Sequence, residues 1–388
     1  MNIVCYSFVL NQHQAPVADE LWTLTNHKFT FVELINLCDT KGGTVDYSKR
    51  PYLLQAWKST ENYQIAMSLC ISADCCIFSG IESLPFEIER MKHNKLSFEM
   101  GERWFKKGAL SLLSPRLWQW LFSYHKGNWR KKKLFKLCCS AYCARDHYKL
   151  FTFRGKCYKW GYFTQVPSEY QHISHVNSDS RILRIMWCAR FIDWKHPEIV
   201  IRLAEKLKKY FESINNRALP NYYSFHIDMY GDGELLNATK ELSLELNTVD
   251  YVSFHGNVLN NIIHEALRNH DLFVFTSDKG EGWGAVANEA MSEGCVLIGS
   301  SEIGAVPFLV RNGENGFIFK DKNIDSLFDV VLKAISCGKE LEKISYKGYL
   351  TIKENWSPQI AAQSLLSLID GLKNENYNPI ASGPCSRM

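Results

Sequence analysis

Hydrophobic and polar positions follow a regular pattern from about residue 181 onward. Short apolar runs rich in β-branched and aromatic residues lie at Ile182–Trp187, Ser224–Tyr230, Tyr251–Phe254, Leu272–Thr276 and Cys295–Gly299. Between the first two runs, apolar residues recur at helical spacing from Ile199 to Phe211. Strands that alternate with amphipathic helices are typical of a parallel sheet with crossover connections. The pattern therefore predicts a Rossmann-like α/β domain over residues 181–355.

The first 165 residues have a less regular pattern, which still predicts a second α/β domain. We expect strands at Ile3–Val9, Phe29–Glu33 and Cys75–Ser79, and helices at Pro16–Leu24, Glu61–Ile71 and Ser83–Lys92. Residues 166–180 are polar and rich in serine, so they are predicted to be a linker. Residues 356–388 are predicted to begin with a helix near Pro358 and to end in a frayed polar tail.

Composition excludes several classes of protein. The 388 residues are 46% hydrophobic, enough to build the cores of two or three domains, so disordered and fibrous classes are excluded. The 13 cysteines are scattered without zinc-site spacing, which favours buried thiols in a reducing cytosol. The apolar run Ile3–Leu10 lacks the flanks of a signal peptide, and no stretch reaches the ~18–20 apolar residues of a membrane span. We expect a cytoplasmic protein, soluble or peripherally attached to the inner face of the membrane.

Charge is distributed unevenly along the chain. The net charge is only +4, yet the stretch from Glu89 to Lys159 holds 18 Lys and Arg against 4 Asp and Glu. Within it, Lys126–Lys136 joins six cations to Trp129, Leu134 and Phe135. On a helix this would be a basic amphipathic surface for anionic membrane headgroups; the alternative is an ordinary solvated face. Because no RNA- or DNA-binding motif is present, we expect no nucleic-acid partner.

The segment from Asp271 to Gly294 carries the most informative motif. A buried strand is followed by a loop with Glu281 and then by a helix with Glu289. Ligands of parallel sheets bind at the carboxyl ends of strands, and Gly282 and Gly284 allow the backbone to approach a ligand closely. The two carboxylates are therefore predicted to serve opposite ends of one extended ligand.

This segment resembles the retaining glycosyltransferases of family 4, of the type that acts on bacterial surface polysaccharides. Their GT-B fold places a Glu-x7-Glu motif at this strand-to-helix turn, and Glu281 and Glu289 have that spacing within the sequence EGWGAVANEAM. The resemblance implies two Rossmann-like domains that face a cleft. It also implies that Gly282, Trp283 and Gly284 line the site of a nucleoside-diphosphate sugar.

Other motifs extend the resemblance over nearly the whole chain. The segment Met186–Leu207 is similar to the family's Gly-Arg…Lys-Gly element, which implies that Arg190 and Lys195 hold the departing diphosphate. The segment ending in Asn257 and Val258 lies where relatives hold the base. In the N-terminal half, the motif Asn-x-His-Gln-x-Pro is similar to one in that family, which implies that His13 contacts donor or acceptor.

The implied reaction moves a sugar from the donor to a hydroxyl of a glycan or lipid-linked acceptor, with retention at the anomeric carbon. Glu281 would orient the sugar, Glu289 would hold the ribose, and no metal or other cofactor is expected. The segment Arg103–Lys107 would meet the phosphates of a lipid-linked acceptor, or would simply be solvated. Two alternatives remain. One is an epimerase or phosphorylase on the same fold, and the other is a non-catalytic scaffold that binds a nucleotide sugar or a membrane.

Overall fold

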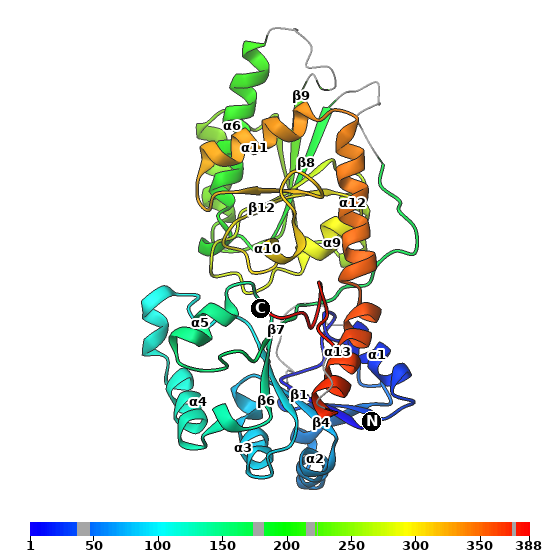
Figure 1. Ribbon diagram of the computed structural model, residues 1–388. Coiled ribbons are helices and arrows are strands. Elements are labelled where there is room, and N and C mark those ends of the chain that lie inside the picture. Colours follow the sequence, from blue (N-terminus) through cyan, green and yellow to red (C-terminus); the bar gives the residue numbers. More distant parts are fainter. Residues whose placement is uncertain (37–46, 174–181, 215–221, 223, 375–377) are drawn as a thin grey trace. The chain divides into compact units, whose positions relative to one another are not determined.

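The computed structural model describes residues 1–36, 47–173, 182–214, 222, 224–374 and 378–388. They form two compact units (Figure 1). The N-terminal unit comprises residues 1–165 and 355–388, and the C-terminal unit comprises residues 166–354. Each unit holds a parallel sheet with helices, so the predicted α/β class is confirmed. Among the described residues, no helix is long and apolar enough to cross a membrane.

The sheet of the N-terminal unit has the strand order β3-β2-β1-β4-β5-β6-β7. The strands are β1 Ile3–Ser7, β2 Phe29–Glu33, β3 Leu53–Gln55, β4 Cys75–Ser79, β5 Ser97–Gly101, β6 Leu134–Cys138 and β7 Cys157–Lys159. The helices are α1 Ala15–Leu24, α2 Thr60–Ser72, α3 Leu84–Lys92, α4 Pro115–Lys126, α5 Cys143–Lys149 and α13 Pro358–Lys373. Short 3₁₀ turns are η1 Ala56–Lys58, η2 Ile81–Ser83, η3 Gly108–Leu113 and η4 Trp129–Lys131. Because strand order reverses between β1 and β4, the carboxyl edge there is a topological switch point.

The sheet of the C-terminal unit has the strand order β10-β9-β8-β11-β12-β13. Its strands are β8 Ile182–Cys188, β9 Ser224–Tyr230, β10 Val252–Gly256, β11 Leu272–Phe275, β12 Val296–Ser300 and β13 Phe317–Phe319. Its helices are α6 Pro197–Ser213, α7 Leu236–Glu245, α8 Asn260–Arg268, α9 Val286–Ser292, α10 Val306–Leu309, α11 Ile324–Ser336 and α12 Glu340–Asn355, with a 3₁₀ turn η5 Asp193–Lys195. The five strands predicted in this half are confirmed to within one or two residues.

Burial explains why the hydrophobic pattern predicted the C-terminal strands and helices closely. All four residues of β11 are buried, and α6 buries the stripe that includes Ile199, Leu203 and Leu207 against the sheet. Pro197 begins α6, where its fixed φ suits the first helical turn and its missing N–H costs no hydrogen bond. The helix and the sheet therefore share one continuous core.

The basic segment Lys126–Lys136 does not form the predicted helix. Lys126 ends α4, Trp129 begins η4, and Leu134 begins β6. Trp129 and Leu134 are buried in the core of the N-terminal unit rather than displayed beside the cations. Lys136 is also buried and forms an ion pair with Glu99 of β5. The prediction of an amphipathic helix here was wrong, because the apolar residues pack against distant parts of the chain.

Hydrogen bonds attach the beginning of the predicted linker and the end of the predicted tail to the two units. The hydroxyl of Tyr349 on α12 donates to the carbonyl oxygens of Pro167 and Ser168 at 3.0 and 3.1 Å, so this stretch lies along the C-terminal unit. Residues 174–180 of the linker fall outside the described residues. The tail is not frayed, because the Cys385 backbone N–H donates to the Lys159 oxygen at 2.7 Å and the Cys385 side chain is fully buried.

Candidate functional site

Lys195 and Glu281 meet at the carboxyl ends of β8 and β11. Lys195 ends the turn η5 after β8, and Glu281 lies in the loop after β11. The Lys195 Nζ donates to Glu281 Oε2, and the two side chains are only 14% and 16% exposed. This ion pair is partly shielded from water, so each charge has a strong influence on the other. Sequence reasoning singled out both residues, and the structure brings them into contact.

Backbone contacts fix the loop that carries Lys195. The hydroxyl of Thr276 donates to the Lys195 carbonyl oxygen at 2.5 Å and accepts from the indole N–H of Trp187 at 2.9 Å. The Asp278 N–H donates to the Trp194 oxygen at 3.0 Å. The loops after β8 and β11 are thus joined at two points, which holds the cation and the carboxylate at one sheet edge.

Two glycines after β9 allow a third loop to pack against this edge. Gly231 has φ +123°, and a Cβ there would lie 2.0 Å from the Ala189 carbonyl oxygen. A Cβ at Gly233 would lie 2.5 Å from the Phe191 oxygen. The Phe191 N–H also donates to the backbone carbonyl oxygen of Asp232 at 2.9 Å. The sequence Gly-Asp-Gly after β9 therefore supports the backbone around Arg190, a role that the sequence analysis missed.

Arg190 lies in the loop after β8, as Lys195 does, and Glu289 lies on α9, which follows the loop of Glu281. The Arg190 guanidinium lies over the ring of Trp194 at 5.6 Å and is exposed to solvent. Glu289 on α9 is 8% exposed, and its burial raises the pKa of its carboxyl group. The charges of Glu289 and Lys195 both act on the Cys188 thiol at the end of β8, and burial raises the pKa of that thiol to about 12. Cys188 is therefore a further group at the end of β8, and sequence reasoning gave no signal for it.

The residues around Glu289 form a second charged group. The ring of His264 on α8 contacts Glu293 at 2.7 Å through Nδ1, and Arg268 donates to the same carboxylate at 2.8 Å. The hydrogen bond with Glu293 raises the pKa of His264. The charge of His264 opposes the effect of burial on the pKa of Glu289. Residues of α8 therefore influence the ionisation of Glu289 without belonging to any sequence motif.

Within the EGWG loop, Gly282, Trp283 and Gly284 have different environments. Gly284 has φ +93°, and a Cβ there would lie 2.6 Å from the Phe275 ring. Trp283 is fully buried and its indole N–H donates to Asn288 at 2.9 Å. The Trp283 side chain is therefore a core residue, so only its backbone is left to serve as a ligand contact. Gly282 is also buried.

The expected base-binding segment follows β10. Asn257 is exposed and Val258 is half-buried. Just before them, His255 stacks on Tyr230 at 4.5 Å and contacts Asp228 at 2.5 Å. Burial alone would raise the pKa of Asp228, but hydrogen bonds from His270 and His255 lower it to about 2. A flat aromatic surface with a fixed carboxylate behind it thus lies beside Asn257.

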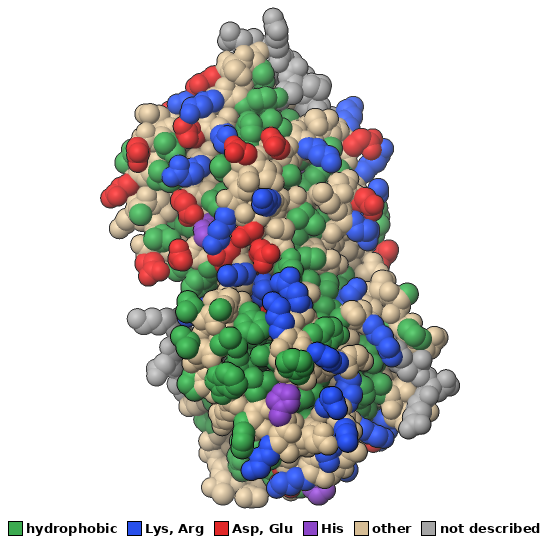
Figure 2. All heavy atoms as spheres, turned by 60° about the vertical axis from the view of Figure 1, so that its left-hand side comes forward, with side chains coloured by type: hydrophobic (Ala, Val, Ile, Leu, Met, Phe, Trp, Pro, Cys, Tyr) green, Lys and Arg blue, Asp and Glu red, His purple; other side chains and the backbone are tan. Residues whose placement is uncertain are grey.

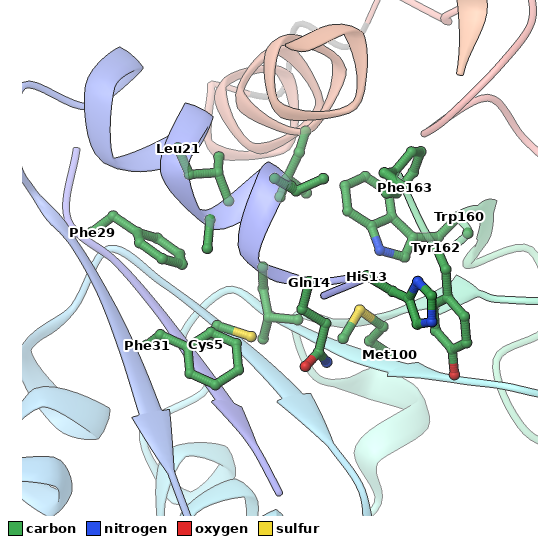
Figure 3. Close-up of a pocket in the computed structure, with 15 residues that line it drawn as sticks. Cys5, His13, Gln14, Leu21, Phe29, Phe31, Met100, Trp160, Tyr162 and Phe163 are labelled. Atoms are coloured by element: carbon green, nitrogen blue, oxygen red, sulfur yellow. The ribbon is translucent and has the colours of Figure 1, made fainter. Parts of the chain in front are cut away.

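His13 lies in the N-terminal unit, in the segment between β1 and α1. Its ring stacks on Tyr162 with centroids 6.0 Å apart (Figure 3). Burial lowers the pKa of His13, and its Nδ1 has no hydrogen-bond partner among the described residues. Figure 3 also shows apolar residues of β1 and β2, such as Cys5 and Phe31, lining a small cavity beneath α1. The imidazole therefore lies beside apolar side chains, and its burial disfavours the protonated form.

A larger pocket of about 530 Å³ opens beside His13 at the switch point of the N-terminal sheet. Its lining includes Ser7 at the end of β1, Ser79 at the end of β4, and Glu82 and Arg116. One carboxylate oxygen of Glu82 is buried without a hydrogen-bond partner in the described part of the chain. A carboxylate, an imidazole and a guanidinium around one pocket suit a hydroxylated ligand.

The cations expected to meet acceptor phosphates have other partners. Arg103 is buried, with its Nε 3.5 Å from Asp146 and its guanidinium over the Tyr142 ring. Lys106 forms an ion pair with Glu102, which also accepts from the Tyr162 hydroxyl at 2.8 Å. Lys107 alone of the three is exposed. Arg103 and Lys106 therefore stabilise the end of β5 rather than presenting open charges.

Comparisons with known proteins agree with this architecture. Residues 173–351 match the family model described as Glycosyl transferases group 1, while no curated protein matches the sequence. HepE from Anabaena, solved in complex with UDP, is 12% identical with a TM-score of 0.69, over 96% of this chain and 100% of HepE. The lipopolysaccharide outer core galactosyltransferase WaaB is 13% identical with a TM-score of 0.67, over 97% of this chain and 99% of WaaB.

The crystal structure of TarM is also similar, at 16% identity and a TM-score of 0.57. The match covers 78% of this chain but 58% of TarM, so the chain spans less than two thirds of that protein. At these identities the structural likeness shows the fold, which is the GT-B fold expected from the sequence. The comparisons thus show the GT-B fold for the chain and a similarity of residues 173–351 to the group 1 glycosyl transferase model.

Proposed function

We propose that the protein transfers a sugar from a nucleoside-diphosphate sugar to a hydroxyl group of a glycan or lipid-linked acceptor, with retention of anomeric configuration. The observation that carries the proposal is the contact between Lys195 and Glu281 at a sheet edge that also holds Arg190 and Glu289. This edge lies within the region that matches the glycosyl transferase model. Anabaena HepE has been solved with UDP-glucose, which supports a nucleotide sugar as donor.

Each residue has a distinct role in this proposal. Glu281 accepts hydrogen bonds from sugar hydroxyls, and Lys195 turns from Glu281 to the diphosphate as the donor enters. Arg190 supplies the second cation, so no metal ion is required to balance the leaving group's charge. Glu289 accepts hydrogen bonds from ribose hydroxyls, and the segment with Asn257 and Val258 holds the base.

The bond changes follow from these positions. The bond between the anomeric carbon and the diphosphate oxygen breaks as the acceptor oxygen bonds to the same carbon. The acceptor proton passes to the departing phosphate, so the reaction needs no separate general base. His13 and the pocket with Glu82 and Arg116 hold the acceptor in the N-terminal unit. The galactosyltransferase WaaB acts on the lipopolysaccharide outer core, which supports a role in surface polysaccharide synthesis.

The test is to incubate the protein with UDP-, GDP- and ADP-sugars and an acceptor extract, and to follow the anomeric proton of the product by NMR. We expect a new glycoside with the configuration of the donor. An inverted product would contradict retention. Donor loss that requires inorganic phosphate would indicate a phosphorylase, a changed free nucleotide sugar would indicate an epimerase, and binding without turnover would indicate a scaffold.

A further inference from the structure

Five large apolar side chains are exposed together on η3 and α4 of the N-terminal unit. We call this the η3–α4 surface; its exposed fractions are 67% for Leu110, 39% for Leu112, 78% for Leu113, 56% for Trp118 and 65% for Phe122. Trp118 and Phe122 are four residues apart and so lie on one face of α4. The opposite face, with Leu117, Trp120, Leu121 and Tyr124, is buried in the core. The helix is thus apolar on both faces, and only one of them is needed for folding.

The local structure holds these side chains outward. The Trp118 indole N–H donates to the Leu112 carbonyl oxygen at 2.6 Å, which ties α4 to η3. The Lys107 N–H donates to the Ser111 hydroxyl at 3.2 Å at the start of η3. The leucines and the indole therefore share one fixed surface, whereas isolated exposed leucines are common on any protein.

Positive charge surrounds the η3–α4 surface. From Arg103 to Arg145 the sequence has 11 Lys and Arg and no Asp or Glu, although Arg103 and Lys136 are buried beside carboxylates. Lys107 and Arg116 are exposed on the same segments, and the Lys126 ammonium lies 5.2 Å from the centre of the Phe122 ring. Figure 2 shows green and blue side chains interspersed over the N-terminal unit on this face, with few red ones.

A groove of about 520 Å³ runs beside Phe122. It is lined by three lysines, Lys92, Lys126 and Lys132, and by apolar side chains that include Ile88 and Met91. The Lys92 ammonium forms an ion pair with Glu89 at 2.6 Å, whereas those of Lys126 and Lys132 have no carboxylate partner among the described residues. A groove of this kind suits an anionic headgroup whose attached chains contact apolar neighbours.

We infer that the η3–α4 surface docks on a bilayer that contains anionic phospholipids. The apolar side chains enter the interfacial layer, and the surrounding cations meet the headgroups. A second copy of the chain is a poorer partner, because two such surfaces would oppose cation to cation. This docking goes beyond the proposed function, since it requires neither donor nor acceptor. The η3–α4 surface takes the place of the segment Lys126–Lys136 as the membrane-facing element, because Trp129 and Leu134 are buried.

Arg116 connects this surface with the acceptor pocket. It lines the pocket beside His13, and Trp118 follows two residues later on α4. Docking would therefore bring the pocket close to the bilayer, within the same unit. If the proposed function is correct, a lipid-linked acceptor could reach the pocket without leaving the membrane.

Co-sedimentation with vesicles tests the inference. The wild-type protein should sediment with vesicles of phosphatidylcholine containing one part in three of phosphatidylglycerol, and much less with phosphatidylcholine alone. L113S/F122S should lower the bound fraction about tenfold, because two inserted side chains are lost. L244S/L259S changes two leucines of the C-terminal unit that are 65% and 71% exposed, and should bind as the wild type does.

The contribution of the cations to vesicle binding is tested separately with the variant K126Q/R130Q/K131Q. Raising salt from about 0.1 M to about 1 M shortens the Debye length from about 10 to about 3 Å, so it should weaken wild-type binding and affect this variant less. Melting curves check that each variant folds; if L113S/F122S does not, L113S alone takes its place. Equal binding of L113S/F122S and the wild type, or no wild-type binding at low salt, would overturn the inference. So would a wild-type dimer that L113S/F122S converts to a monomer.

Discussion

Lys195 and Glu281 lie 86 residues apart in the sequence and form a largely buried ion pair at the carboxyl edge of the C-terminal sheet. In the proposed function, both side chains bind other groups once a donor is bound. The lysine then meets the diphosphate and the carboxylate meets sugar hydroxyls. The pair therefore holds both side chains in place before the donor arrives.

Separating the pair should have opposite effects on nucleotide binding. Glu281→Gln frees Lys195, so a nucleoside diphosphate without sugar should bind at least as tightly as to the wild type, while turnover falls. Lys195→Met removes a cation and should weaken binding of the same nucleotide about 10- to 150-fold, the range of a charged hydrogen bond. Calorimetry measures both affinities. Lys206→Met, which breaks the 2.7 Å ion pair with Asp325 on the same unit, serves as the control.

Glu289→Ala should weaken the nucleotide and not only the sugar. A carboxylate that accepts from ribose hydroxyls contributes about 1.5–3 kcal/mol, so the dissociation constant should rise by about 10- to 150-fold. The comparison with Glu281→Gln is the sharp one, because both changes remove one negative charge from the same sheet edge. Equal losses of nucleotide affinity in the two variants would contradict the separate roles.

Gly231→Ala should disturb the Arg190 loop more than backbone strain alone explains. A methyl group there meets the Ala189 carbonyl oxygen at 2.0 Å, so the loop must move. Gly155 also has positive φ, at +69°, but a Cβ there meets nothing within 4 Å. Gly155→Ala should therefore cost only the ~1–2 kcal/mol of a left-handed residue. Urea denaturation and nucleotide titration compare the two; a Gly231→Ala protein with unchanged stability and affinity would show that the loop tolerates the shift.

His264 should make stability depend on pH. Its hydrogen bond with Glu293 raises its pKa in the folded protein above the ordinary 6.5, so its stabilising contribution is complete below pH 6.5. The contribution disappears as pH rises through the raised pKa. His264→Gln should thus lower the melting temperature most at pH 6 or below and progressively less at higher pH. In a Glu293→Gln background the same change should lose this pH dependence, and a constant difference across pH would refute the assignment.

The sequence was most informative where structure is set locally. The strand β11 is fully apolar and α6 has a clear buried stripe, so both were predicted closely. The strands β3, β7 and β13 were not predicted, because three residues carry no periodicity and depend on pairing with distant strands. The five-residue strands β5 and β6 were not predicted either. The error at Trp129 has the same origin. A helical projection placed this residue beside exposed lysines, whereas the fold packs it against Tyr124 and other core residues.

The residues of the candidate site also divide into those that were predicted from the sequence and those that were not. Glu281 and Glu289 were found from their places after a predicted strand, and Arg190 and Lys195 from the resemblance to a known family. Their surroundings could not be found so, because Cys188 and His264 belong to no motif and act through space. The residues that we propose to face a membrane also differ from those that the sequence suggested, because Trp118 is exposed and Trp129 is buried.

The central claim is that the C-terminal unit binds a nucleotide sugar, and the melting temperature of the wild-type protein across a complete panel of UDP-, GDP- and ADP-sugars tests it most directly. A ligand at a hundredfold excess over its dissociation constant stabilises the folded state by about 2.7 kcal/mol. We predict a clear upward shift for at least one nucleotide class, and loss of that shift in Glu289→Ala. Unchanged melting with every member of the panel would contradict the donor site and the function built on it.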